Sequence, residues 1–237
     1  MDKQLKDTTI LIPTLNEYNN LRILLKQFLL LSKEIKILLV DDSSEKEYNK
    51  LFKLKEDYPR LEIIIIRGKK RGVGTAVRMG IKNIKTKYFI IMMGDLSDDP
   101  KDVPKLISKL RDGYQIVFGS RFIKGSYILD YPVIKFISNR LTNILVALIF
   151  MIKSHDITGA FAGYLTYPLI NEKFISQRFS IFIEIPIIGK LKGMSYCEVP
   201  VTWRNRIEGQ SNMKLIKAGN DYWLTILRLF FKRLRKH

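Results

Sequence analysis

The sequence predicts an α/β fold with a mostly parallel sheet and helices on both faces. Short apolar runs alternate with helical patterns through the first half of the chain, which is typical of βαβ units. The run 88–93 is apolar throughout, as expected for a strand that is buried on both faces of a sheet. Polar or turn-forming residues follow most of the runs. We therefore expect ligands to bind at the carboxyl edge of the sheet.

Five strands are expected in this half, at 8–14, 35–40, 61–66, 88–93 and 114–119. The expected helices are one that opens at Asn16-Glu17, followed by 46–57, 72–84 and 101–111. Apolar residues at helical spacing support the first helix, and a glycine turn precedes the third. Pro100 fits the first turn of the fourth helix with Asp99 as its N-cap. A later strand is expected at 195–203.

Composition indicates a globular protein. The 237 residues are 46% hydrophobic and 27% charged, enough apolar content for a real core. The single Cys197 excludes an internal disulfide and favours a reducing compartment. Only His155 and His237 are histidines, so a histidine-based metal site is not expected.

The formal charge of +18 calls for a partner such as nucleic acid, an anionic membrane surface or a phosphorylated substrate. The lysines are scattered over nearly every expected helix, whereas nucleic-acid binding favours a concentrated basic face with interleaved aromatics. We therefore expect no nucleic acid as partner.

Three carboxylates, Asp95, Asp98 and Asp99, follow the apolar run 88–93. Such a cluster can hold a hard cation, which takes oxygen ligands and keeps waters or substrate phosphates in its shell. Turn formation and helix capping explain Asp98 and Asp99 equally well. They explain Asp95 poorly, because an acid directly after a buried strand faces the crevice.

Three more features lie at the same expected edge. Glu17 starts a helix, where it could be only a partner of the helix dipole. Asp41 follows the second strand, where an acid can accept a hydrogen bond from a base or ribose, and Ser43 or Ser44 is a candidate N-cap. The stretch 71–76 opens a helix with small residues, which allows close approach of a ligand or of the sheet.

Taken together, these motifs resemble glycosyltransferase family 2. IPTLNE (12–17), VDDSS (40–44), RGVGTAVRMG (71–80), DLSDDP (95–100) and GSRF (119–122) occur in the family's order and spacing. The stretches 132–143, 155–158 and 198–211, with Glu184, resemble the branch of dolichyl-phosphate mannosyltransferases and polyprenyl-phosphate glycosyltransferases. The resemblance implies a GT-A (Rossmann-like) fold and an inverting transfer of a hexose from GDP or UDP.

The resemblance also implies roles for individual residues. The nucleotide-sugar site would comprise Pro13, Glu17, Asp41, Gly74, Ala76 and Asp95. Asp95 and Asp98 would hold Mg²⁺ or Mn²⁺. The phosphates would meet Arg121, Arg140, Arg206, Ser211 and Lys214, and the catalytic residues would be Asp95, Arg121 and Arg206. Glu184 and Asp156 match acids of the acceptor half.

The sequence departs from the family pattern in two places. Met93 stands where the family has the first acid of its D-x-D motif, and Ser97 where a Gln is common. Asn212 stands where a Lys often follows the serine, and Lys214 could substitute for it. Weaker metal binding is expected, and a nucleotide-sugar-binding protein without turnover is one alternative.

The expected acceptor is an isoprenoid lipid phosphate. A monophosphate has a second pKa near 6, so it is ionised at neutral pH and needs alignment rather than a strong base. A saccharide or other hydroxyl acceptor is the second alternative, and it would require a carboxylate base, for which Asp98 or Glu184 are candidates.

Two apolar segments bear on the membrane. The stretch 141–152 is shorter than the ~20 residues of a spanning helix, and the C-terminal stretch 222–236 is basic, amphipathic and aromatic, as in an interfacial helix. A helix docked on the domain would have the same pattern. We expect peripheral attachment to the cytoplasmic face with no spanning helix, or a separate membrane-anchor subunit. The expected parts are a donor lobe (1–120), an acceptor lobe (121–213) and the C-terminal helix (214–237).

Overall fold

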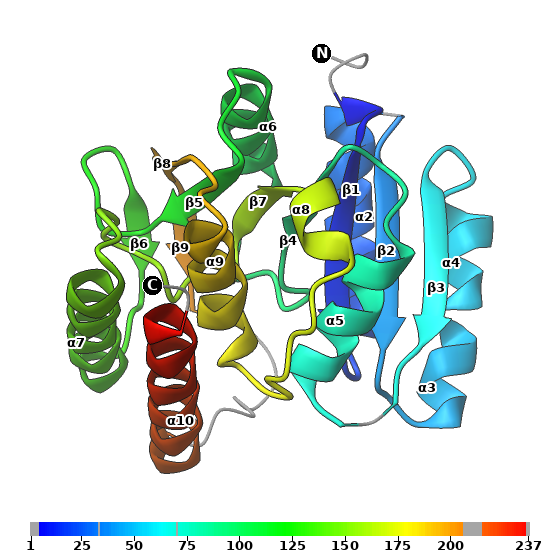
Figure 1. Ribbon diagram of the computed structural model, residues 1–237. Coiled ribbons are helices and arrows are strands. Elements are labelled where there is room, and N and C mark those ends of the chain that lie inside the picture. The colour runs from blue at the N-terminus through cyan, green and yellow to red at the C-terminus, as the bar shows by residue number, and fades with distance from the viewer. Residues whose placement is uncertain (1–4, 33, 70, 206–214, 236–237) are drawn as a thin grey trace.

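The computed structural model describes residues 5–32, 34–69, 71–205 and 215–235, the first four of the last range by their backbone alone. One sheet runs through the molecule, with helices on both of its faces (Figure 1). Strands from both halves of the chain contribute to it, in the order β3-β2-β1-β4-β7-β5-β8. All neighbouring pairs are parallel except those of β7, which is antiparallel to β4 and β5.

The strands of this sheet are β1 (Thr8–Thr14), β2 (Lys36–Asp41), β3 (Glu62–Arg67), β4 (Tyr88–Ile91), β5 (Ile116–Ser120), β7 (Ala162–Leu165) and β8 (Tyr196–Pro200). A second, two-stranded sheet pairs β6 (Tyr127–Leu129) with β9 (Thr202–Arg204) in parallel. The expected strands are all present. The stretch 195–203 differs, because it breaks at Val201 and contributes one strand to each sheet.

The helices are α2 (Tyr18–Leu31), α3 (Glu45–Lys50), α4 (Phe52–Asp57), α5 (Val73–Asn83), η1 (Pro100–Asp102), α6 (Val103–Arg111), α7 (Val133–Phe150), α8 (Tyr167–Ile170), α9 (Ile181–Leu191) and α10 (Leu215–Leu234). Alternate residues along β1 and β4 pack into two different apolar clusters. Ile10 and Ile90 pack with the buried residues of α2 and α6, and Leu11 and Ile91 with those of α5 and α9. The core is therefore two apolar layers that the sheet separates.

Local signals in the sequence explain the starts of α3 and η1. Ser44 accepts a hydrogen bond from the N–H of Glu47, and Asp99 accepts one from Lys101, as expected of N-caps. The expected single helix 46–57 is wrong in one respect, because α3 and α4 are separate helices that meet at Leu51. The apolar run 88–93 forms a strand only to Ile91.

Helices α7 and α10 lie side by side at one end of the molecule (Figure 1). The apolar segment expected at 141–152 was too short, since α7 begins at Val133 and has 18 residues. Its mean hydropathy is 1.6, and only 17% of it is buried. By length and composition α7 is capable of crossing a membrane, a test that core helices of soluble proteins also pass.

Candidate active site

Two buried carboxylates lie just beyond the end of β4. Asp95 and Asp98 are each 6% exposed. Ser97 donates to Asp95 Oδ1 from its hydroxyl (2.6 Å) and from its N–H (3.1 Å), and the N–H of Met93 donates to Asp98 Oδ2 at 3.3 Å. Leu96 has a left-handed backbone (φ 61°), which turns the chain sharply enough to bring both acids to one place.

The two carboxylates repel each other electrostatically. Burial, and then the charge of Asp95, raise the pKa of Asp98 to about 7, against the smaller opposing effects of the Met93 N–H and Arg121. A cation that enters would offset the repulsion between the two carboxylates.

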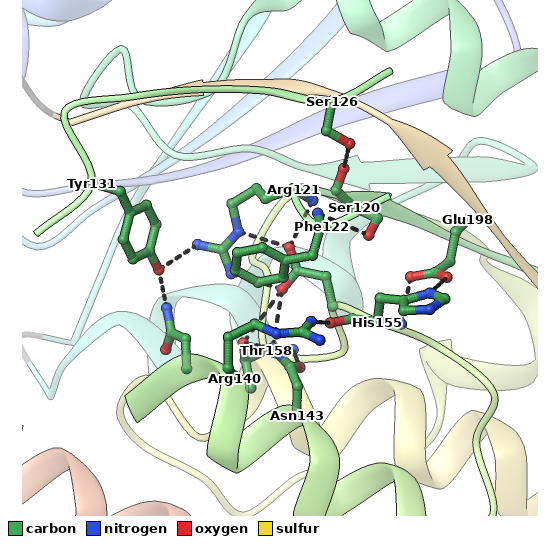
Figure 2. Close-up of polar contacts among 12 residues, drawn as sticks. Ser120, Arg121, Phe122, Ser126, Tyr131, Arg140, Asn143, His155, Thr158 and Glu198 are labelled. Carbon is green, nitrogen blue, oxygen red and sulfur yellow. Dashed lines mark hydrogen bonds and ion pairs between the residues drawn. The ribbon is translucent and has the colours of Figure 1, made fainter. Parts of the chain in front are cut away.

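Arg121 follows directly after β5, and its charge acts on Asp98. Its hydrogen-bonded partner, however, is Asp156. Its Nε and Nη2 donate to the two oxygens of Asp156, each at 2.7 Å, and its backbone N–H donates to the same carboxylate. Figure 2 shows the Arg121 guanidinium also directed at the hydroxyl of Tyr131. Burial opposes the charge of Arg121, yet Asp156 outweighs it and raises the Arg121 pKa above its ordinary value. Arg121 is thus held in one orientation rather than free to swing toward a ligand.

A cavity of about 160 Å³ joins these groups. Its polar lining includes Asp95, Ser97, Asp98, Arg121, Lys135, Asn139, Thr158 and Asn205. Its aromatic lining consists of Tyr131, Phe161, Phe179, Phe182, Trp203 and Tyr222. We call this cavity the catalytic pocket. It combines acids, cations and aromatic walls, the mixture expected where a charged group and an apolar chain meet.

Strand β9 closes one side of the catalytic pocket. Trp203 pairs with Asp98 in an isolated antiparallel bridge, and the Arg204 N–H donates to the carbonyl of Ser97 at 2.9 Å. The Trp203 ring lies 4.6 Å from the ring of Tyr131. The late strand therefore places an aromatic wall directly on the acid-bearing turn.

Asp41, at the end of β2, has a different environment. It is 1% exposed and accepts hydrogen bonds from Thr14 Oγ1 (2.9 Å) and from the Ser43 hydroxyl (2.6 Å) and N–H (3.1 Å). Arg67 Nη1 lies 3.4 Å from its other side. These donors tie together the loops after β1, β2 and β3.

Glu17 and Pro13 stand at the same edge. Glu17 is half-buried and accepts a hydrogen bond from Asn20, and Pro13 is buried in β1. No contact in the structure tests their predicted role toward a nucleoside.

Gly74 and Ala76 pack against protein. A side chain on Gly74 would come within 2.6 Å of the carbonyls of Ser176 and Arg178, and the Gly74 N–H donates to Gln177. Ala76 is 2% exposed and belongs to the apolar core. These contacts explain why both residues are small, and their role beside a nucleoside stays a prediction.

Arg140 and Glu184 also lie outside the catalytic pocket. Arg140 donates to the carbonyl of His155 at 3.0 Å and its guanidinium lies over the Phe122 ring (Figure 2). Glu184 is 1% exposed and accepts from the N–H groups of Ile175 and Ser176 and from Arg228. The Glu184 carboxylate therefore anchors α10, and its use as a base for a hydroxyl acceptor stays a prediction.

Three predicted phosphate ligands, Arg206, Ser211 and Lys214, lie outside the described residues. Two cations were missed. Lys135 on α7 lines the catalytic pocket, and Arg67 is the last residue of β3. Lys135 lies in the stretch 132–143, which resembles the family branch, but nothing in that stretch singled it out.

The acids fit a divalent cation incompletely. Within the ranges described above, no group of three or more His, Cys, Asp or Glu side chains is placed to hold a metal. Asp95 and Asp98 supply hard oxygen donors, and burial together with the charge of Asp95 raises the pKa of Asp98. Such a pair suits Mg²⁺ or Mn²⁺ when a ligand diphosphate supplies the remaining oxygens.

Comparison with known proteins places the chain. Residues 9–171 match the model of "Glycosyl transferase family 2". The chain belongs to this family, as the motifs predicted. It is 31% identical over 212 residues to the dolichol-phosphate mannosyltransferase of Pyrococcus furiosus, covering 87% of this chain and 59% of that relative. It is 26% identical over 213 residues to the polyprenol monophosphomannose synthase of Mycolicibacterium smegmatis, covering 87% and 80%.

Solved structures show the same fold. The glucosyl-3-phosphoglycerate synthase of Mycobacterium tuberculosis superposes with a TM-score of 0.69 at 14% identity, covering 98% of this chain and 81% of that one. Crystals of that enzyme contain UDP with Mn²⁺ (TM-score 0.67, 13% identity, 95% and 79% covered) or with Mg²⁺. The expected GT-A fold is confirmed. The chain spans about 59% of the length of the Pyrococcus relative.

Proposed function

We propose that this chain is an inverting glycosyltransferase that moves a hexose from a GDP- or UDP-sugar to dolichyl or polyprenyl phosphate at a membrane surface. The single observation that carries the proposal is the catalytic pocket, where the acid pair Asp95–Asp98 faces Arg121 and Lys135. The names of the Pyrococcus and Mycolicibacterium relatives support an isoprenoid phosphate as acceptor and mannose as the sugar.

The donor side depends on the two acids. Asp95 and Asp98 would hold Mg²⁺ or Mn²⁺, which would neutralise the charge that develops on the leaving nucleoside diphosphate. The Mycobacterium tuberculosis crystals that contain UDP with Mn²⁺ or Mg²⁺ support that pairing of metal and nucleotide. Ser97 orients Asp95 through two hydrogen bonds. Arg121, fixed by Asp156, adds a permanent positive charge beside them.

The acceptor side depends on α7. Lys135 and Asn139 line the pocket from the start of this helix, so a lipid phosphate could be bound there by an ammonium group and an amide. An ionised phosphate oxygen is itself the nucleophile that forms the new bond at the anomeric carbon. The pocket then needs to align the phosphate and exclude water, which its aromatic walls favour.

The membrane part of the proposal is supported by exposed apolar side chains on two neighbouring helices. On α7 they are Val133, Ile134, Phe136, Ile137, Leu141, Ile144 and Leu148, and on α10 they are Trp223, Leu224, Leu227, Phe230, Phe231 and Leu234. The opposite side of α10 is docked, since Ile226 and Leu229 are buried and Ser180 donates to Asp221 at 2.7 Å. We propose that these helices lie in the cytoplasmic membrane interface, with Lys and Arg at the headgroups.

The test is a matrix of nucleotide sugars and acceptors. Purified protein is incubated with radiolabelled GDP-mannose, UDP-glucose or UDP-galactose, with dolichyl phosphate or a saccharide, and with Mg²⁺, Mn²⁺ or EDTA. The proposal predicts metal-dependent label in the lipid-phosphate fraction. Its matched control is Asp99→Asn, which keeps a capping side chain outside the pocket and should transfer at the wild-type rate.

A hydroxyl acceptor is the second candidate, because one observation favours it. The pKa of Asp98, near 7, is where a general base works best at neutral pH. Label that appears on a saccharide and not on dolichyl phosphate would select this reaction. Nucleotide binding without turnover on any acceptor would select a binding protein.

A further inference from the structure

A second cavity lies between α5 and the segment that follows α8. It measures about 480 Å³ and shares no lining residue with the catalytic pocket. Its charged rim consists of Lys69, Arg71, Arg78, Lys82, Lys173 and Glu172. We call it the cationic pocket. In Figure 1 the two bordering elements, α5 and α8, lie side by side on the face of the sheet that also carries α9.

The single carboxylate on this rim does not balance the five cations. Glu172 accepts from Lys192 at 2.9 Å and from Lys232 at 3.0 Å, both outside the cavity lining. Partial burial opposes its ionisation, but these two hydrogen bonds prevail and lower the pKa of Glu172. The charge of Glu172 is therefore balanced by Lys192 and Lys232, which lie outside the cavity lining. The rim keeps a net positive charge.

Four of the cations have no counter-ion within the part of the chain that the structure describes. Lys69, Arg71, Lys82 and Lys173 are exposed, and none pairs there with a carboxylate. Like charges that converge on one hollow repel each other unless an anion joins them. A single lysine on the surface meets no such repulsion, whereas this group of cations is stabilised by a bound anion.

Arg78, which lines the cavity, is fixed in place by hydrogen bonds. Its Nη1 donates to the carbonyls of Phe174 (2.8 Å) and Ile175 (3.2 Å), and its Nη2 to Thr75 Oγ1 (3.2 Å). Thr75 is 5% exposed. A guanidinium that is already oriented loses little entropy when it binds an oxyanion, which makes Arg78 the natural centre of the site.

The apolar part of the lining is formed by Met79, Ile81, Ile170 and Phe174. We propose that the cationic pocket binds a phosphate-bearing anion, separately from the transfer reaction. The phosphate would meet Arg78, Lys82 and Lys173, and the carbon-bearing part of the ligand would pack on Met79. This site is independent of the proposed function, because none of its residues lines the catalytic pocket.

Two methionines make the test specific. Met79 lines the cationic pocket and Met93 lines the catalytic pocket, so their methyl NMR signals report the two sites separately. Protein labelled at the methionine methyl groups is titrated with inorganic pyrophosphate in EDTA. The proposal predicts a saturable shift of the Met79 signal whose midpoint is independent of any change at Met93, because the two pockets share no lining residue.

The variant pair removes equal charge in two places. Lys82→Gln/Lys173→Gln should weaken pyrophosphate binding at Met79 by roughly tenfold or more. Lys26→Gln/Lys53→Gln, on the exposed faces of α2 and α4, should leave it unchanged. Equal weakening in both variants, a Met79 shift that does not saturate, or a shift at Met93 alone would each overturn the proposal.

The phosphate could belong to a lipid headgroup or to a soluble compound, and a vesicle experiment distinguishes these sources. Both variants are floated with phosphatidylcholine vesicles that contain or lack phosphatidylglycerol. If the source is a lipid, Lys82→Gln/Lys173→Gln loses the phosphatidylglycerol-dependent binding that Lys26→Gln/Lys53→Gln keeps. If both variants float alike while the Met79 result holds, the ligand is a soluble phosphate.

Discussion

Asp41 and the Asp95–Asp98 pair lie at the same edge of the same sheet, yet their surroundings differ. Asp41 accepts three hydrogen bonds from Thr14 and Ser43 and faces Arg67. Asp98 accepts one from a backbone N–H and faces a second carboxylate. Both regions bury negative charge, but Asp41 faces an arginine, whereas Asp98 lies beside another carboxylate, Asp95.

The comparison shows how to separate a structural acid from a functional one. A buried carboxylate whose oxygens are occupied by protein donors fixes the loops that carry those donors. A buried pair of neighbouring carboxylates favours an external cation, because the cation offsets the repulsion between them. Asp156 is also a structural acid in this sense, because its oxygens accept the hydrogen bonds that hold Arg121.

The largest effect should come from the acid pair. Asp95→Asn should lower transfer at least ~100-fold, because the leaving diphosphate loses its main electrostatic partner. Asp99→Asn should transfer normally, and circular dichroism should show both variants folded. Wild-type turnover in Asp95→Asn would remove the functional half of the comparison.

Breaking the Arg121–Asp156 pair tests the structural half. Arg121→Ala leaves Asp156 charged and wholly buried, which should cost about 3–5 kcal/mol in the free energy of unfolding. Urea denaturation measures this cost. The double variant Arg121→Ala/Asp156→Ala should recover part of the loss, since no unpaired charge remains. Additive losses would mean that the two side chains do not act as a pair.

The pH dependence of stability tests Asp98. Its pKa is raised from 3.8 to about 7 in the folded protein, so protonated Asp98 stabilises the fold. That stability is fully present below pH 3.8 and is lost as pH rises through about 7. Asp98→Asn has no carboxyl group to ionise at this position, so its stability does not show this loss.

The variant should therefore gain stability relative to wild type between about pH 4 and pH 8, by up to ~4 kcal/mol. Urea denaturation at several pH values without divalent cations gives the difference. Parallel curves for the two proteins would show that Asp98 has an ordinary pKa.

Asp41→Asn should have the smallest effect. It removes the ionic contact with Arg67 and one acceptor oxygen, at a cost of about 1–3 kcal/mol in the free energy of unfolding. Transfer by the folded variant should fall far less than in Asp95→Asn. A loss of transfer as large as that of Asp95→Asn, at unchanged stability, would move Asp41 into the functional class.

The sequence predicted the strands and the acid-bearing turn because each depends on local pattern. An apolar run followed by Gly94 and Asp95 predicts a buried strand that ends at the edge of the sheet. The family motifs predicted the membership that the comparison confirmed.

Long-range packing explains why local sequence patterns could not show the surroundings of Gly74, Glu184 and Lys135. Gly74 resembles a ligand-binding glycine, but the segment 176–178, about a hundred residues away, fills that space. Glu184 looks like a free acid until Arg228 is placed beside it. Lys135 gave no motif of its own, and only the folding of α7 against the pocket shows its position.

The most direct measurement is the binding of Mn²⁺ by electron paramagnetic resonance in the presence of a nucleoside diphosphate. The wild type and Asp99→Asn should bind the ion, Asp41→Asn should bind it nearly as well, and Asp95→Asn and Asp98→Asn should lose most of the bound signal. Equal binding in all five proteins would contradict the account, because the acid pair would then have no cation to hold.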